Sequence, residues 1–279
     1  GSVVFDEKNR SGLGEKGKGP LVAIYTAHGT RAQCLAYSND RGRTWQKYAD
    51  NPVLPNTGGL DGDPAVFWHE PTQHWILLMF TARDGDKTEF GFFRSTDLLS
   101  WEQISTLWLD VNGICPDIFQ LALDNDSDKI RWVLWLTKSE YVVGHFDGRH
   151  FIPETDVRQC YDGRMKPRGS LYAARTFHNT PNAPDRQISI AWFSQNFTGM
   201  PFNQALSFPV ELSLKTTEKG PSIYFKPVQQ IRMLHQKSVV HNDVRLEDST
   251  VCVPGIAGDL YHIKLTFQPG NADRKSTRL

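Results

Sequence analysis

The stretch Trp75-Ile76-Leu77-Leu78-Met79-Phe80 is the longest wholly apolar run in this 279-residue chain. It is far shorter than the roughly 20 residues that a membrane-spanning helix needs, and its length between turn residues and charges indicates a strand. Comparable runs occupy residues 21–25, 132–136 and 188–193, and the starts of the four runs lie 54, 57 and 56 residues apart. Several short strands repeating at a period near 50 predict the blades of a β-propeller.

A turn marker follows three of these runs at a similar interval. It occurs as Ser38–Trp45, Ser95–Trp101 and Phe146–Phe151, each with an Asp near the start of the turn and an aromatic residue four or five positions later. An Asp in such a turn accepts hydrogen bonds from the N–H groups of the turn itself. The first copy resembles the Asp-box of sialidase-like propellers, and we interpret it as a structural turn.

A third marker begins the repeats, as Pro64–Phe67, Pro116–Phe119 and Leu171–Ala174, at intervals of 52 and 55 residues. The innermost strands of a propeller line its central channel. The residues just before each of these segments are therefore expected to converge on one mouth of the channel, where a site would lie. In particular, Asp63 and Ile114 are expected to face the same funnel from neighbouring inner strands.

The repeats predict an all-β chain with two domains. We expect a propeller domain over residues 1–230, and a linker with an incomplete β-sandwich over 231–279, whose strands would be Ser249–Val253 and Tyr261–Phe267. Two strands cannot bury the face of a sheet on their own. The four blades are predicted at residues 1–50, 51–106, 107–157 and 158–220.

Composition excludes several functional classes. The 31 basic and 31 acidic residues balance, so no strong electrostatic attraction to nucleic acid is expected, and no segment suits a membrane. The four cysteines, Cys34, Cys115, Cys160 and Cys252, are isolated in the sequence, and neither they nor the nine His show the close spacing of a metal site. We expect no metal and no cofactor. Residues 1–20 are polar and Gly-rich and do not resemble a signal peptide.

Eight segments in unbroken order resemble glycoside hydrolase family 32, the family of invertases, inulinases and levanases. The resemblance implies a five-bladed propeller, of which the first blade is missing here, followed by a β-sandwich. It further implies retaining hydrolysis of β-fructofuranosides such as sucrose, inulin or levan, and an extracellular or periplasmic location. The matching segments are Leu21–His28, Ala36–Trp45, Asn51–Leu54, Gly62–His69, Cys115–Phe119, Leu171–Phe177, Ile190–Trp192 and Leu206–Leu212.

The resemblance also assigns expected roles to individual residues. Asp63 matches the transition-state stabiliser of the family's Arg-Asp-Pro segment, which also binds fructose hydroxyls, and Trp192 matches an apolar sugar contact. Ile114 stands where the family's Glu-Cys-Pro-Asp segment has its acid/base Glu, Gly62 where Arg-Asp-Pro has its Arg, and Ser170 where an Asp precedes the Tyr-Ala strand. The family's nucleophile lies in a Trp-x-Asn-Asp-Pro-Asn segment, and the 279 residues contain no such segment.

Three functions remain open from the sequence. The chain is part of a fructan-degrading glycosidase, a propeller that binds a fructose-containing saccharide without cutting it, or a structural remnant without a ligand. Ile114 favours the second or third of these, because an isoleucine has no proton to give to a leaving group. Purely structural roles are also open for three of these residues: Asp63 as a turn residue, Asp117 as a structural hydrogen-bonding group, and Trp192 as a core residue.

Overall fold

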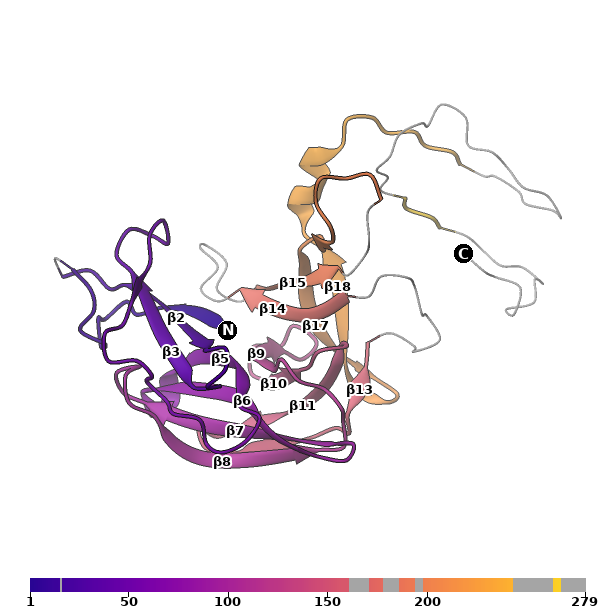
Figure 1. The fold of residues 1–279 in the computed structure, drawn as a ribbon. Helices are drawn as coiled ribbons and strands as arrows, with labels where there is room; N and C mark the ends of the chain where they lie inside the picture. Colours follow the sequence, from indigo (N-terminus) through magenta and orange to yellow (C-terminus); the bar gives the residue numbers. More distant parts are fainter. Residues whose placement is uncertain (16, 161–170, 178–185, 194–197, 243–262, 267–279) are drawn as a thin grey trace. The chain divides into compact units, whose positions relative to one another are not determined.

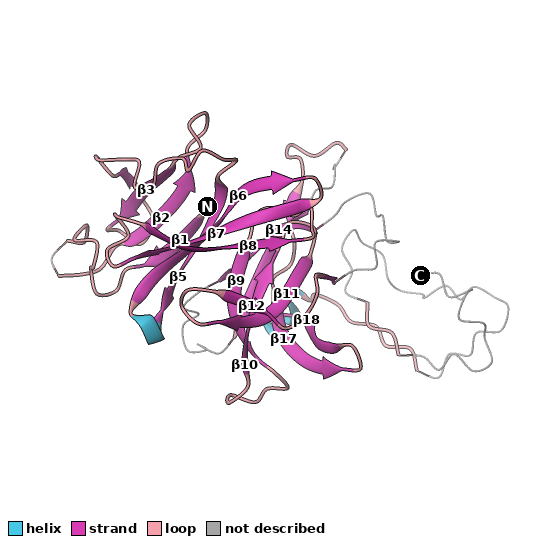
Figure 2. Ribbon diagram, turned by 90° about the horizontal axis from the view of Figure 1, so that it is seen from below, coloured by secondary structure: helices cyan, strands magenta, loops and turns pink. Residues whose placement is uncertain are grey.

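The computed structural model describes residues 1–15, 17–160, 171–177, 186–193, 198–242 and 263–266, and these form two compact units, Gly1–Gln229 and Gln230–Leu279. The first unit contains four antiparallel sheets that follow one another in chain order (Figure 1). The prediction of an all-β chain with four propeller blades is therefore confirmed. In the described residues helix is confined to two short 3₁₀ segments, η1 (Glu70–Thr72) and η2 (Gln229–Leu234), and neither is long and apolar enough to cross a membrane (Figure 2).

In each sheet neighbouring strands are antiparallel, and the strand that comes first in the sequence lies at one end of the row. The first two sheets have the orders β1-β2-β3-β4 and β5-β6-β7-β8, and the last two have β12-β11-β10-β9 and β14-β15-β17-β18, with β13 beside β11 and β16 beside β15. The first two sheets consist of β1 (Ser2–Phe5), β2 (Leu21–Thr26), β3 (Gln33–Ser38), β4 (Gln46–Lys47), β5 (Gly62–His69), β6 (His74–Asp84), β7 (Lys87–Ser95) and β8 (Glu102–Leu109). The last two consist of β9 (Asp117–Ala122), β10 (Ile130–Trp135), β11 (Glu140–Phe146), β12 (Phe151–Pro153), β13 (Arg158–Gln159), β14 (Leu171–Phe177), β15 (Gln187–Phe193), β16 (Ala205–Leu206), β17 (Val210–Thr217) and β18 (Gly220–Pro227).

The apolar run in β6 is continuous because both faces of its sheet are covered. Side chains alternate between the two faces of a strand, and Leu77 and Met79 enter a core cluster shared with the first sheet. Ile76 and Leu78 enter a different cluster, shared with the third sheet. A sheet packed on both faces must be apolar at nearly every position.

The third sheet is buried in the same way, and the outer two sheets are not. In β10, Leu134 packs toward the second sheet and Val133 toward the fourth, and both are fully buried. The first and fourth sheets each bury one face in these clusters. On their other faces apolar side chains are exposed, as at Phe5 (43%) and Phe177 (52%).

The predicted turns form as expected in three blades. Asp40 accepts a hydrogen bond from the Thr44 N–H (2.8 Å), and Asp97 accepts from the N–H groups that follow it in the second blade. In the third blade Asp147 accepts from the N–H of His150 (2.6 Å). The turn bonds lower the pKa of Asp40 to about 2, chiefly through the backbone and hydroxyl of Thr44. The Asp residues of this marker are thus structural acceptors.

The inner strands share an unusual backbone feature. Asp63, Cys115 and Ala173 have positive φ angles of 56°, 51° and 47°, in a left-handed region that few non-glycine residues adopt. At Asp63 and Ala173 the strand pairing shifts register, which marks a β-bulge. The sequence marker aligned Leu171 with Pro64, whereas the backbone puts Ala173 in line with Asp63 and Cys115. The same register shift occurs in both strands, between Gly62 and Ala65 and between Tyr172 and Arg175, so the predicted equivalence of Leu171 with Pro64 is off by three residues.

The β-sandwich domain expected over residues 231–279 stays a prediction, because the structure describes only residues 231–242 and 263–266 of this range. Ser249–Val253 and Cys252 lie outside the described residues. Of Tyr261–Phe267, only residues 263–266 are described, and they have no regular secondary structure, so that part of the predicted strand is wrong. The first sheet ends, as predicted, before residue 50, and the fourth extends to Pro227, seven residues past the predicted blade boundary.

We predict that Leu78→Ala destabilises the propeller unit far more than Leu60→Ala. Leu78 is fully buried between two sheets, whereas Leu60 is 46% exposed. Removing a buried leucine side chain leaves a cavity that costs about 2–5 kcal/mol, while an exposed substitution stays within about 0.5 kcal/mol. Urea unfolding followed by tryptophan fluorescence measures both, and equal midpoints for the two variants would contradict packing between the sheets.

Candidate active site

Asp63 lies near the start of β5, on the inner strand of the second sheet. Its N–H donates to the Thr26 hydroxyl (3.2 Å), which ties β5 to β2 of the first sheet. Its side chain is partly buried and accepts a hydrogen bond from the Cys115 thiol, with Sγ 3.3 Å from Oδ2. The left-handed backbone of both residues directs these side chains toward each other across two blades.

The Cys115 thiol is held in its protonated form. Burial is the first cause that raises its pKa, and the charge of Asp63 and the hydrogen bond to it add to the rise, to about 11. A thiol with such a pKa is a hydrogen-bond donor at neutral pH and a poor nucleophile, because the thiolate is the reactive form. Cys115 therefore serves here to hold the Asp63 carboxylate in place.

Ile114 lies beside Cys115, in the loop before β9. Its N–H donates to the Thr137 hydroxyl (2.7 Å), and that hydroxyl donates in turn to the Ile114 carbonyl. Its partly buried side chain packs against the cluster between the second and third sheets. The expectation that Ile114 sits on an inner strand is wrong by three residues. The strand begins at Asp117, because Pro116 has no N–H to donate and Cys115 is left-handed.

Arg175 joins the inner strands of three blades. From β14 its guanidinium donates to the carbonyls of Pro116 (2.5 Å) and Asp63 (3.4 Å), and it lies 3.8 Å from an Asp117 carboxylate oxygen. Asp117 is 3% exposed and also accepts from the N–H (2.7 Å) and hydroxyl (2.9 Å) of Thr176. Asp117 is thus a structural hydrogen-bonding group, as one interpretation of the sequence held.

Trp192 lies on β15, on the face of the fourth sheet opposite its core, and is 41% exposed. Its ring meets Tyr172 of β14 edge-on, with centroids 5.5 Å apart. Burial raises the pKa of the Tyr172 phenol, and the proximity of Cys115 and Asp63 raises it further. Trp192 is thus an exposed ring in contact with Tyr172, and the core interpretation of Trp192 is wrong.

Gly62 leaves space where the resemblance expects an arginine. A Cβ at this position would have the Arg31 guanidinium as its nearest neighbour, at 3.6 Å. Arg31 reaches this place from the loop after β2 and donates to the carbonyls of Leu60 (2.9 Å) and Asp61 (3.2 Å). The Arg31 guanidinium, which comes from the loop between β2 and β3, thus lies beside Gly62. Ser170 lies outside the described residues.

Sequence reasoning missed Arg31, Arg175 and Thr137 as parts of this region. One signal was available for Arg175, which interrupts an apolar inner-strand marker with a charge. Nothing in the local sequence marks Arg31 or Thr137. The part of the chain that the structure describes contains no group of three or more His, Cys, Asp or Glu side chains placed to hold a metal ion.

The arrangement can bind hydroxyl groups and offers no acid at position 114. The Asp63 carboxylate keeps acceptor capacity beyond its bond to the thiol, since two oxygens provide about four acceptor sites. Asp117 is already occupied by Thr176 and Arg175. Retaining glycosidases need two carboxyl groups about 5–5.5 Å apart, one of them a proton donor, and the side chain at 114 is a hydrocarbon.

We predict that Cys115 is alkylated slowly at pH 8 and that Asp63→Asn speeds the reaction. The Asp63 charge and hydrogen bond raise the thiol pKa, so their removal lowers it and increases the thiolate fraction at any pH below about 11. Burial remains and keeps the pKa above that of a free thiol. Iodoacetamide labelling between pH 7 and 10, read by mass spectrometry at each cysteine, measures this.

Cys34 in the same protein is the internal control, because it lies in the first sheet and Asp63 is not among the causes of its shifted pKa. Its labelling rate is expected to be the same with and without Asp63→Asn. Equal Cys115 rates in the two proteins would show that the thiol and the carboxylate do not interact.

Comparison with known proteins identifies relatives over most of the chain. A levanase of Bacillus subtilis (strain 168) is 33% identical over 301 residues, covering 98% of this chain and 43% of the levanase. The extracellular exo-inulinase inuE of Aspergillus niger is 28% identical over 318 residues, covering 96% of this chain and 58% of the relative. The chain thus spans about half the length of these two proteins.

Solved structures share the fold. The crystal structure of exo-inulinase from Aspergillus awamori superposes with a TM-score of 0.67 at 26% identity, over 81% of this chain and 52% of that one. The β-fructofuranosidase of Schwanniomyces occidentalis in complex with fructosyl-erythritol gives 0.67 at 26% identity, over 82% and 48%. Residues 1–227 match the N-terminal domain of glycosyl hydrolases family 32, and the chain therefore belongs to that family.

Proposed function

We propose that this chain binds a β-fructofuranoside at the region around Asp63 and leaves its glycosidic bond intact. The observation that carries the proposal is Ile114, which stands at the acid/base position. Both of its backbone polar groups are bonded to Thr137, and its side chain packs against a core cluster. These contacts hold Ile114 in place, and its hydrocarbon side chain has no proton to donate.

Binding rests on Asp63 and on the aromatic pair near it. A furanose presents hydroxyl groups that donate to a carboxylate, and Cys115 occupies only part of the acceptor capacity of Asp63. Trp192 offers an exposed ring, and Tyr172 supports that ring edge-on. Aromatic side chains with a polar partner suit ligands that have one apolar and one wet face. A related propeller crystallised with fructosyl-erythritol supports the choice of sugar.

Hydrolysis by the two-carboxylate route lacks both of its groups in these 279 residues. Protonation of the leaving oxygen by a positioned acid typically contributes 10²–10⁴-fold to the rate, and an isoleucine cannot supply it. Without the Asp of a Trp-x-Asn-Asp-Pro-Asn segment, no covalent fructosyl intermediate forms by this route. The family membership therefore supports a β-fructofuranoside ligand, and the residue at 114 argues against turnover.

The same relatives support an extracellular setting for the protein. The Aspergillus niger relative is named an extracellular exo-inulinase. We propose that this chain also acts outside the cytoplasm, where polymeric fructans are accessible. In the described part of the chain no disulfide joins the three free cysteines, Cys34, Cys115 and Cys160.

We predict no release of fructose from sucrose, inulin or levan by this chain, and none after Ile114→Glu. The substitution restores a proton donor, while the 279 residues contain no Trp-x-Asn-Asp-Pro-Asn segment to supply the carboxylate nucleophile. Isothermal titration with fructose and short levan oligosaccharides is expected to show binding that Asp63→Ala weakens by about tenfold or more, a factor that corresponds to about 1.4 kcal/mol. Released fructose is assayed enzymatically on the same samples.

Asp86→Ala is the matched control, because Asp86 is an exposed carboxylate in the turn between β6 and β7. It is expected to bind as the unmodified chain does. Reproducible turnover by the unmodified chain, abolished by Asp63→Ala, would overturn the proposal and show that another residue supplies the acid. If no fructose-containing probe binds, the chain is a structural remnant without a ligand.

A further inference from the structure

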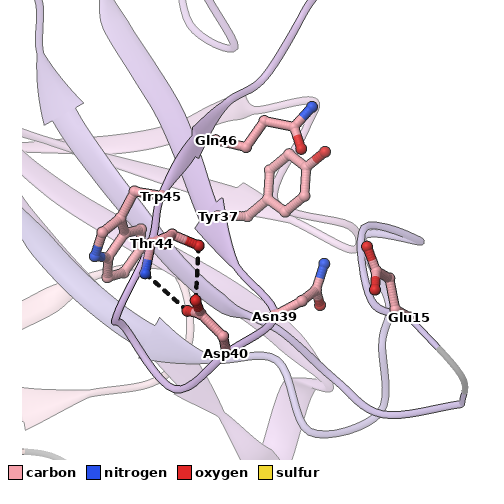
Figure 3. A pocket seen from close by; sticks show the side chains of 7 residues that line it. All are labelled: Glu15, Tyr37, Asn39, Asp40, Thr44, Trp45 and Gln46. Atoms are coloured by element: carbon pink, nitrogen blue, oxygen red, sulfur yellow. Dashed lines mark hydrogen bonds between the residues drawn. The ribbon is translucent and has the colours of Figure 1, made fainter.

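A cavity of about 300 Å³ opens on the first sheet, away from the Asp63 region. It is lined by residues of β3, of the β3–β4 turn and of β4, and by Glu15 from the loop between β1 and β2 (Figure 3). Ligand sites in proteins commonly have volumes of about 300–1,000 Å³. This cavity is at the small end of that range, which suits one ring of a saccharide better than an extended ligand. We name it the Tyr37–Trp45 cup.

The wall of the cup is built rigidly by the Asp-marked turn. Both carboxylate oxygens of Asp40 accept bonds from Thr44, one from its N–H (2.8 Å) and one from its hydroxyl (2.7 Å), as Figure 3 shows. Ser38 donates a further bond to Asp40 (2.8 Å). The turn is therefore a preformed support, so binding in the cup requires little ordering of the backbone.

Trp45 is more exposed than the turn itself requires, whereas Tyr37 is partly buried against a core cluster. Trp45 donates from its indole N–H to the Gly42 carbonyl (3.1 Å) and is 44% exposed. The equivalent Trp101 of the second blade makes the same bond, to the Leu98 carbonyl (3.1 Å), yet packs against a core cluster. The turn geometry is thus compatible with a covered ring, and the first blade leaves its ring open beside a cavity.

Polar groups surround the aromatic surface. Tyr37 and Gln46 are cross-strand partners on β3 and β4, so the phenol and the amide lie beside each other at one side of the cup (Figure 3). The Asn39 amide is oriented by donating to the Leu13 carbonyl (3.1 Å), which leaves its oxygen as an acceptor. Amides and a phenol both donate and accept, which matches hydroxyl groups that do the same.

The charge of the cup selects against anions. Asp40 remains ionised above about pH 2 because of its bonds to Thr44, and Glu15 adds a second carboxylate to the lining. A phosphate or uronate would meet two negative charges. A metal ion is not indicated either, because the described residues hold no cluster of three metal-binding side chains. A neutral polyol ring fits the remaining chemistry.

We propose that the Tyr37–Trp45 cup is a second saccharide-binding site, which holds one ring of a neutral glycan beside Tyr37, Gln46 and Asn39, with Trp45 at the rim of the cup, without cutting it. It is built on β3 and the edge strand β4, whereas Asp63 lies on the inner strand of the next sheet. Binding in the cup is therefore independent of the Asp63 region. A propeller with such a site would stay attached to a polysaccharide while its channel is empty.

The test is a titration by saturation-transfer NMR with four neutral oligosaccharides that contain no fructose, the sugar proposed for the Asp63 region: cellotetraose, xylotetraose, maltotetraose and mannotetraose. At least one is expected to bind the unmodified chain, with about tenfold weaker affinity in Trp45→Ala. Trp108→Ala is the matched control, because Trp108 is 45% exposed on β8 and lines no part of the cup. It is expected to bind as the unmodified chain does.

A second variant keeps the proposal falsifiable if Trp45→Ala disturbs the turn. Gln46→Ala removes an exposed amide from the edge strand and is expected to weaken binding severalfold with an unchanged unfolding midpoint. Tetragalacturonate is the anionic probe and is expected not to bind. Absence of binding by all four neutral probes, binding by Trp45→Ala and Gln46→Ala as strong as by the unmodified chain, or preference for tetragalacturonate would each overturn the proposal.

Discussion

Packing of sheets against sheets on both faces is the constraint on which the rest of this structure depends. The second and third sheets bury side chains of both strand faces, so their interior strands have almost no position where a polar group is tolerated. Chemistry is therefore confined to strand ends, to turns and to the edges of the sheets. Asp63 and Cys115 lie where inner strands begin, and the Tyr37–Trp45 cup lies at a turn and an edge strand.

The inner ends of the blades are connected by polar contacts that the apolar clusters cannot supply. Arg175 reaches carbonyls of two other blades, and Asp117 satisfies the Thr176 N–H and hydroxyl in a buried place. A buried carboxylate is tolerated only when its oxygens are hydrogen-bonded or paired. These contacts hold the starts of β5 and β9 beside the second half of β14, and the Cys115 thiol lies within hydrogen-bond distance of the Asp63 carboxylate.

The backbone around position 114 forms a frame that is held by hydrogen bonds and by sheet packing. The neighbouring Cys115-Pro116-Asp117 segment is intact, the Thr137 hydroxyl holds the loop, and the backbone at Cys115 has the same left-handed turn as Asp63. Ile114 places a hydrocarbon side chain on this frame. The frame itself survives because it depends on backbone hydrogen bonds and on sheet packing, and neither requires a carboxylic acid at that position.

The sequence by itself determined the local and periodic features of this protein. The spacing of the apolar runs predicted four blades, the Asp-marked turns formed as expected, and the motifs around Asp63 and Cys115 identified the family. These features are encoded by residues close together in the chain, because strand alternation and turn hydrogen bonds involve near neighbours. The sequence marker aligned Leu171 with Pro64, three residues away from the match that the structure shows, because the register of β14 depends on its pairing with β15.

Only the tertiary structure decided which side chains meet. The Cys115–Asp63 bond joins residues 52 positions apart, and the Arg175–Asp63 bond joins residues 112 apart. Such pairs depend on how whole blades pack, which no local pattern records. The same reason applies to Arg31, which lies beside Gly62. It also applies to Trp45, whose ring is exposed, whereas the equivalent Trp101 packs against a core cluster. In each case residues distant in the sequence determine what the side chain contacts.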